Sequence, residues 1–145
     1  MIFFLENFDS IPPLTVGKVL SALTNMVKDV KIRQTLVSSA LLWPVAIAAL
    51  DKLAHVHFPT SPDMADLALN LLGLLHNLSF ENHVMVRQNA QNLATKICRF
   101  MQEKNSSQLF LRALGLFGNL VSRYESAAAV LMQFVERLMA VLKIG

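Results

Sequence analysis

The sequence predicts an all-α protein, a solenoid in which about three helical repeats stack side by side. Its apolar residues recur at spacings of three and four rather than two, which is the period of a helix and not of a strand. One short pattern also recurs at intervals of roughly 40 to 50 residues, the interval expected of helical repeats. The three segments that share this pattern are 20–26, 72–78 and 114–120.

Each of these segments has the spacing of a helix that is buried along one side. Apolar residues stand five before, two before and one after a shared asparagine, which is the i, i+3, i+6 stripe of such a helix. A small residue stands four before it. Segment 72–78, Leu-Gly-Leu-Leu-His-Asn-Leu, has Gly73 in this place, and the other two have Ser21 and Gly115.

These segments resemble the third helix of armadillo repeats, a helix that ends in small-x-Leu-x-Asn-Leu. The upstream half of such a repeat is seen once, in 32–47, where armadillo repeats carry a short helix, a tight turn and a proline, here Pro44, that opens the second helix. The turn glycine is absent near Ser39, and the later units lack an internal proline, so they resemble the two-helix HEAT variety. The resemblance implies a right-handed superhelix of armadillo/HEAT type over most of the chain. Its repeat units cover about 13–57, 62–103 and 108–144.

The individual helices follow from start and stop residues in chain order. Residues 1–11 are expected to be the tail end of a preceding helix. Pro13 opens the next one, because a proline in the first turn lacks only an N–H that has no helical partner there. After the clearest loop, 57–63, Ser61 is the expected N-cap and Pro62 the first helical residue. The predicted helices cover about 13–28, 31–39, 43–56, 62–80, 84–103, 108–121 and 126–144. Inward-facing stripes are predicted at Val86, Ala90, Leu93, Ile97 and Phe100, and at Val130, Phe134, Leu138 and Leu142.

A hydrophobic fraction of 54% and a positive mean hydropathy are high for an isolated globular domain. Two explanations compete: a membrane protein, or a piece of a longer solenoid whose terminal repeats are normally covered. The longest uncharged run, 34–50, contains polar residues and a proline, and it is shorter than the about 20 apolar residues that a membrane-spanning helix needs. We therefore expect residues 1–145 to form a single armadillo-like domain, a fragment of a longer solenoid.

The charges and the single cysteine favour an intracellular protein without a nucleic-acid partner. The net charge is +3, and the 13 Lys and Arg residues are scattered rather than clustered as a nucleic-acid surface requires. The apolar start, 1–5, lacks the basic flank and the longer apolar centre of a signal peptide. Cys98 has no second cysteine to pair with, which agrees with a reducing compartment. We expect a cytoplasmic location, with nuclear or cytoskeletal association as alternatives.

Catalytic, metal and cofactor sites are not expected in this sequence. His55 and His57 stand near Asp51, but two histidines at i, i+2 on a helix point about 200° apart, so surface positions are the better interpretation. Cys98 has basic neighbours that favour a thiolate. With no histidine near it in sequence, however, a buried helical cysteine is the better interpretation. No enzymatic activity follows from these residues.

The glycines and asparagines of the shared pattern carry more information. A mid-helix glycine costs about 1 kcal/mol relative to alanine, so Gly73 and Gly115 indicate either a close helix approach or a surface kept open. Asparagine is a poor helix former, and its recurrence at one helical position needs another reason. In armadillo proteins that bind extended peptides, the matching asparagine lies in a concave groove and hydrogen-bonds the ligand backbone. The resemblance thus implies a ligand-binding ladder of Asn25, Asn77 and Asn119. The alternative is an internal bond that ties one repeat to the next.

Two further positions of the pattern describe the chemistry of this predicted groove. The nuclear-signal receptors of the family carry a tryptophan four residues before the asparagine, which is absent here, so the aromatic slots for lysine stems are missing. Seven before the asparagine stand two basic residues and one asparagine. A polar, mildly basic groove suits an acidic or backbone-read partner segment. The predicted groove residues are Lys18, Ser21, Asn25, Asn70, Gly73, Asn77, Arg112, Gly115 and Asn119.

The sequence therefore predicts a non-enzymatic scaffold that binds a protein or an extended peptide segment along a concave groove. One alternative is a purely structural segment that packs on neighbouring repeats or self-associates through apolar ends, 1–8 and 135–144. The other is a membrane-associated helical protein.

Overall fold

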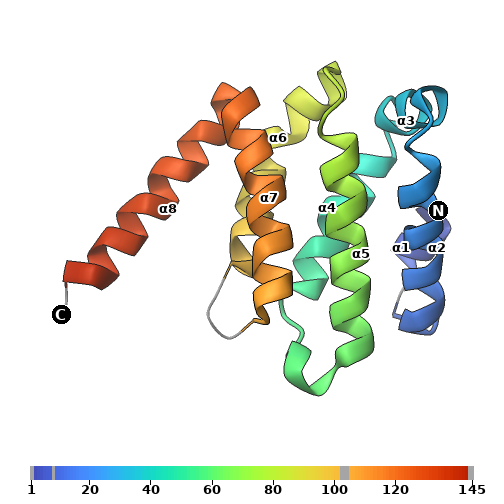
Figure 1. Ribbon diagram of the computed structural model, residues 1–145, viewed down its shortest axis with the longest axis horizontal. Helices are drawn as coiled ribbons and strands as arrows, with labels where there is room; N and C mark the ends of the chain where they lie inside the picture. The colour runs from blue at the N-terminus through green and yellow to red at the C-terminus, as the bar shows by residue number, and fades with distance from the viewer. Residues whose placement is uncertain (1, 8, 102–104, 144–145) are drawn as a thin grey trace.

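The computed structural model describes residues 2–7, 9–101 and 105–143, and every regular element within them is helical (Figure 1). The all-α prediction is confirmed. Two short 3₁₀ turns, η1 (Phe58–Thr60) and η2 (Cys98–Phe100), accompany the α-helices. The α-helices are α1 (Ile2–Glu6), α2 (Pro13–Met26), α3 (Val30–Val37), α4 (Leu42–Leu53), α5 (Pro62–Leu78), α6 (Val84–Ile97), α7 (Ser107–Arg123) and α8 (Glu125–Lys143).

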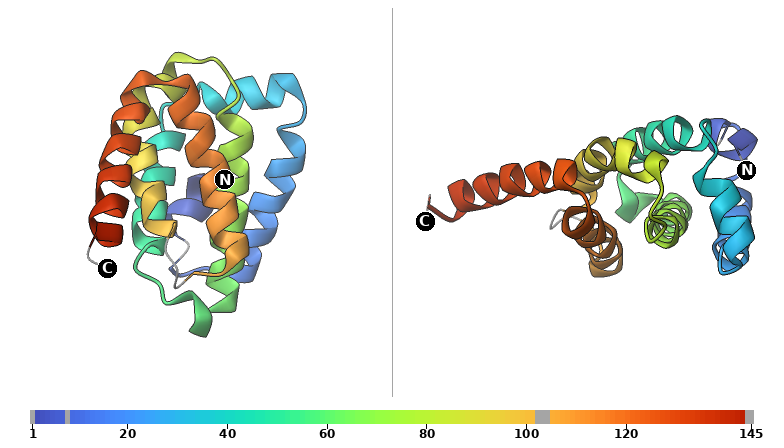
Figure 2. Two further views of the ribbon diagram at one scale, coloured as in Figure 1. Left: turned by 60° about the vertical axis from the view of Figure 1, so that its left-hand side comes forward. Right: turned by 90° about the horizontal axis from the view of Figure 1, so that it is seen from above.

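The helices form two layers, and apart from short α3, successive helices along the chain belong alternately to one layer and the other. Helices α2, α5 and α7 lie side by side in one layer, which we call the inner layer. Helices α1, α4, α6 and α8 form the second row behind it, each in contact with the next (Figure 2). Short α3 lies at the end of the molecule beside α2. The three segments of the shared pattern thus occupy neighbouring helices of one layer.

The core lies between the two layers and is almost entirely apolar. Trp43 at the start of α4 is fully buried, and its indole Nε1 donates a hydrogen bond to the Val37 carbonyl at 3.0 Å. The predicted stripe of α6 is confirmed, since all five of its residues are buried. In α8, Val130 is buried and Phe134 half-buried, while the side chains of Leu138 and Leu142 lie outside the part that the structure describes.

The apolar stripe of the shared pattern is buried fully only in α5. Met26 and Leu114 occupy the same stripe in α2 and α7, but they are 49% and 42% exposed. The prediction is wrong at these two positions for a simple reason. Helix α5 has an inner-layer neighbour on each side, whereas α2 and α7 each contact only α5 within that layer.

Capping residues explain most helix starts. Asp29 caps α3, because its carboxylate accepts hydrogen bonds from the backbone N–H groups of Lys31 and Ile32. Ser106 caps α7 by accepting from the Leu109 N–H at 3.2 Å. Ser61 takes the predicted N-cap position before Pro62, but its side chain makes no capping bond.

Several predicted helix ends were too late along the chain. Helix α2 ends at Met26 rather than 28, and α4 at Leu53 rather than 56. The helix predicted over 84–103 ends at Ile97 and tightens into η2, where Phe100 stacks on Phe58 with ring centroids 6.2 Å apart. Residues 1, 8, 103 and 144, which several predicted segments include, lie outside the described residues.

Among the described helices, none alone is long and apolar enough to cross a membrane. The pair α3 and α4 meets the criteria of length and composition only when taken together, and it is bent by 79°.

Candidate functional site

The nine predicted groove residues all lie on the inner layer, three on each of its helices. Those of α2, namely Lys18, Ser21 and Asn25, are exposed. Their counterparts on α5 are more covered, because α5 is flanked on both sides: Gly73 is buried, and its two asparagines are half-buried. The candidate site therefore crosses two seams, α2–α5 and α5–α7, where these helices meet.

Glycines admit the neighbouring side chains at the α5–α7 seam. A Cβ added to Gly73 would stand 2.6 Å from Nη1 of Arg112, so the guanidinium lies directly over the glycine backbone. A Cβ on Gly115 would stand 3.4 Å from Cε1 of the His76 ring. Of the two interpretations left open for Gly73, the structure supports close approach rather than an open surface. Gly115 remains exposed and faces a hollow.

Asn119 is bonded inside the protein. Its amide Nδ2 donates to Oγ of Ser79 at 2.5 Å, and that hydroxyl in turn donates to the His76 carbonyl at 2.6 Å. Ser79 is completely buried at the end of α5. This asparagine thus ties α7 to α5, which corresponds to the internal bond rather than to a ladder position open for a ligand.

Asn77 holds the same pattern position at the α2–α5 seam but is not bonded in this way. It lines a surface hollow together with Val27, Lys28, Arg33 and Phe80. Within the residues that the structure describes, its side chain makes no hydrogen bond. The Asn77 amide therefore keeps both its donors and its acceptor available at the surface.

The remaining asparagines of the predicted groove differ again. Asn70 donates to the Asp66 carbonyl of its own helix at 3.0 Å and lies beside Gly17 of α2. Asn25 is exposed on α2, which has no inner-layer neighbour on that side among the described helices. A uniform ladder is therefore absent from the three equivalent asparagines, because each faces a different neighbour.

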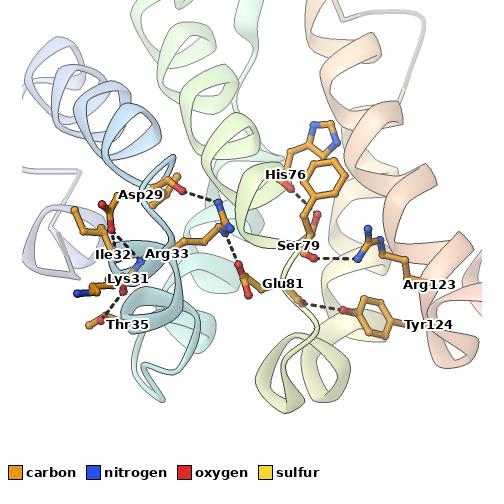
Figure 3. Close-up of polar contacts among 12 residues, drawn as sticks. Asp29, Lys31, Ile32, Arg33, Thr35, His76, Ser79, Glu81, Arg123 and Tyr124 are labelled. Carbon is orange, nitrogen blue, oxygen red and sulfur yellow. Dashed lines mark hydrogen bonds and ion pairs between the residues drawn. The ribbon is translucent and has the colours of Figure 1, made fainter.

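The turn after α5, residues 79–83, is held from both sides, as Figure 3 shows. Arg33 of α3 forms an ion pair with Glu81 and donates to the Val27 carbonyl at 3.2 Å. From the other side, Arg123 donates to the Phe80 carbonyl at 3.0 Å and the Tyr124 hydroxyl to the Glu81 carbonyl at 3.3 Å. Sequence reasoning missed the three contacts to the turn itself, because their partners are more than 40 residues apart and share no spacing pattern.

An exposed aromatic ring lies next to this turn. Phe80 is 50% exposed, stacks on His76 at 5.2 Å between ring centroids, and has the Arg123 guanidinium carbon 5.3 Å from its ring centre. His76 itself lines a second hollow with Arg112 and Gly115. Partial burial, helped by the charge of Arg112, lowers the pKa of His76 below its usual value. Phe80 and His76 were not predicted, although an exposed aromatic after a helix end is a recognisable signal.

Several cations of this face differ in their pairing from the cations around Asp51 in the second row. Asp51 of α4 pairs with Lys96 and Arg99, and the hydrogen bond from Lys96 helps to lower the pKa of that carboxyl. No carboxylate among the described residues lies within ion-pair distance of four cations on the inner-layer side. They are Lys18, Lys28, Arg112 and Arg123. The acids of α5, Asp63 and Asp66, stand in its first turns, at the other end of the helix from Phe80.

The other residues considered for chemistry have ordinary surroundings. His57 lies beyond the end of α4, and its Nδ1 stands 3.2 Å from the Thr60 hydroxyl. Cys98 is buried in η2, and burial raises the pKa of its thiol, with the charge of Arg137 acting in the opposite direction. The described residues contain no group of three or more His, Cys, Asp or Glu side chains placed to hold a metal ion.

Comparison with known proteins adds no relative: no protein-family model, no curated protein and no solved structure matches the chain.

Proposed function

We propose that this protein is a non-enzymatic interaction module of armadillo/HEAT type, a right-handed solenoid that binds an extended, acidic protein segment across its inner layer. The observation that carries the proposal is the pairing of charges. Four cations without a carboxylate partner among the described residues lie along the inner-layer side, whereas Lys52, Lys96 and Arg99 on the second-row side are each paired with an acid. A surface of this kind attracts and orients a partner of opposite charge.

The arrangement of the helices supports the repeat part of the proposal. Segments that share one sequence pattern lie in α2, α5 and α7, and these helices are neighbours in one layer. The helices between them form the second row in the same order. Stacked units of this kind, each in contact only with its neighbours, are typical of helical-repeat proteins.

Three features of the face suit an extended acidic segment. Arg112 and Arg123 can hold carboxylates, Arg in particular by two parallel hydrogen bonds. Asn77 can both donate to and accept from a peptide backbone. The exposed ring of Phe80 offers an apolar contact between these polar groups. Together they match a segment in which acidic and apolar residues alternate along a backbone that the face also contacts.

The proposal is tested with fluorescent peptides in which acidic residues alternate with apolar ones, compared with peptides of the same length that carry Gln in place of every acid. We expect binding of the acidic peptides only, with an affinity that falls as salt is raised. In the Arg112→Gln/Arg123→Gln protein this binding should weaken about tenfold or more, given about 1.5 to 3 kcal/mol for a hydrogen bond to a charged group.

The matched control is Arg87→Gln/Arg137→Gln, which removes the same charge from exposed positions of α6 and α8. It should bind the acidic peptides nearly as tightly as the unmodified protein. Equal binding of acidic and Gln-substituted peptides, or equal weakening in both double variants, would show that the inner-layer cations do not recognise the partner. Tight binding of single-stranded RNA in place of the peptides would assign the face to a nucleic acid instead.

A further inference from the structure

Helix α8 carries apolar residues on two opposite sides. One side faces α6 and α7 and includes Ala127 and Val130, which are buried. On the other side Met132, Val135 and Met139 are 60%, 40% and 48% exposed. Their i, i+3, i+7 spacing makes them one ridge along the helix, which we call the α8 ridge. A helix that is apolar on both sides is normally covered on both.

The α8 ridge lies at one end of the molecule. Figure 2 shows α8 as the last member of its row, extending away from the other helices. Helices α2 and α3 lie at the opposite end (Figure 1), and their side chains line an open hollow that is mainly apolar. Its lining residues, which we call the α2–α3 hollow, are Leu23, Ile32, Leu36, Lys31 and Thr35. The three apolar ones are only half-buried. The molecule therefore presents an apolar ridge at one end and an apolar hollow at the other.

We propose that the α8 ridge of one copy docks into the α2–α3 hollow of a second copy, so that the protein assembles head to tail. Charge complementarity favours this occupant. Glu136 is exposed one position along from Val135 and borders the ridge, while Lys31 stands on the rim of the hollow. Docking in this sense brings a carboxylate next to an ammonium group. The surface is separate from the peptide-binding face, so the two proposals fail independently.

The same charges disfavour the symmetric alternative, in which two α8 ridges pair with each other. Antiparallel pairing centred on Val135 would bring Glu136 close to Glu136 of the second copy, and like charges at an interface repel. A head-to-tail contact uses two different surfaces and leaves one of each free at the ends of the assembly. Larger species should therefore form as the concentration rises, without a fixed stoichiometry.

The test is sedimentation velocity of the full chain over a wide concentration range. We expect an average mass that rises beyond that of a dimer. Met132→Gln/Met139→Gln should keep the protein monomeric, because Gln retains helix propensity but removes the apolar ridge. Val84→Gln, a matched change at an exposed apolar residue of α6, should associate like the unmodified protein. Circular dichroism confirms that each variant is folded.

A charge exchange distinguishes the two geometries. Glu136→Lys and Lys31→Glu should each weaken association about tenfold or more, and the double variant should restore it, because the pair is reversed rather than lost. Symmetric α8 pairing predicts no effect of Lys31→Glu, and that result would overturn the head-to-tail proposal. A protein that stays monomeric at every concentration, or an association that the ridge variant leaves unchanged, would overturn it as well.

Discussion

Asn119 and Asn77 occupy the same position of one recurring pattern, yet their surroundings differ at the two seams of the inner layer. Asn119 donates to the buried hydroxyl of Ser79 across the α5–α7 seam. Asn77 lies at the α2–α5 seam, where it lines an open hollow together with Val27. Ser79 and Val27 are themselves equivalent, since each follows the asparagine of its own helix by two residues. The residue on the preceding helix therefore decides whether the asparagine is an internal tie.

The same position in the sequence pattern therefore does not give Asn77 and Asn119 the same structural role. The shared helical spacing gives both asparagines the same direction, but only one of them meets a hydrogen-bonding partner. The α5–α7 seam is closed by polar contacts on both sides of Ser79, including the Arg123 bond to the following turn. The α2–α5 seam leaves an amide free beside Lys28. We infer that Asn119 contributes to the packing of its own seam, whereas Asn77, with an amide that is unbonded among the described residues, is the better placed of the two for a ligand.

We call the α5–α7 seam, where Asn119 is bonded to Ser79, the closed seam, and the α2–α5 seam, where Asn77 is unbonded among the described residues, the open seam. The largest change is expected when Val27 of the open seam is replaced by serine, the residue at the equivalent position of the closed seam. Val27 is 1% exposed, so Val27→Ser should cost about 1 to 3 kcal/mol through lost apolar burial and a newly buried hydroxyl. If the two seams differ only in this residue, Asn77 will bond the new hydroxyl. The cost should then be about 0.5 to 1.5 kcal/mol greater in an Asn77→Ala background. Urea unfolding of the four proteins measures this coupling, and strictly additive costs would refute it.

A smaller loss of stability is expected when the Asn119–Ser79 hydrogen bond of the closed seam is removed. Asn119→Ala removes the bond to Ser79 and should lower the free energy of unfolding by about 0.5 to 1.5 kcal/mol. The better helix propensity of alanine offsets part of this. Ser79→Ala is the matched variant, and the two losses should not add, because both remove the same bond. An Asn119→Ala protein as stable as the unmodified one would mean that the bond contributes nothing to the seam.

The same substitution at the open seam should barely change stability. Asn77→Ala is expected to stay within about 0.5 kcal/mol of the unmodified protein, because its side chain has no partner to lose among the described residues. Binding of the acidic peptides should instead weaken about tenfold, which is the loss of about 1.4 kcal/mol. Asn119→Ala should leave that binding nearly intact. Thermal unfolding and peptide titration are measured for both Asn77→Ala and Asn119→Ala. If the two variants lose the same stability and the same affinity, the two asparagines do not differ in role.

The sequence was sufficient for the presence of the helices and for much of the side of each that faces the core, although Met26 and Leu114 of the predicted stripes are exposed. Local spacing determines both, as the buried stripe of α6 and the proline starts of α2 and α5 illustrate. It was not sufficient for the seams. Whether Asn119 bonds Ser79, or Arg33 reaches Glu81, depends on the lateral distance between helices and on long side chains that cross it. Neither the lateral distance between helices nor the reach of these side chains produces a periodic pattern in the sequence. Right-handed superhelical winding and the acidic partner remain predictions.

The smallest effect concerns pH, and it is confined to the closed seam. The pKa of His76 is lowered, first by partial burial and then by Arg112. As the pH falls through about 6.5, His76 is therefore protonated more readily in the unfolded chain than in the folded protein. Stability contributed by the neutral ring is complete above that pH and is lost progressively below it. Asp51 acts separately, because its pKa is lowered from 3.8 and its contribution is lost only in more acidic solution.

His76→Gln should thus flatten the decline in unfolding free energy between about pH 7.5 and 5.5, where histidine titrates. Arg112→Gln removes only the second cause, so its profile should lie between those of His76→Gln and the unmodified protein. Gln is polar and a good helix former, which makes loss of the helix a poor explanation for either result. The open seam has no histidine beside Gly17, where Asn70 lies instead. A profile of the unmodified protein that coincides with that of His76→Gln would mean that the imidazole is freely protonated in the folded state and that the closed seam leaves it open to water.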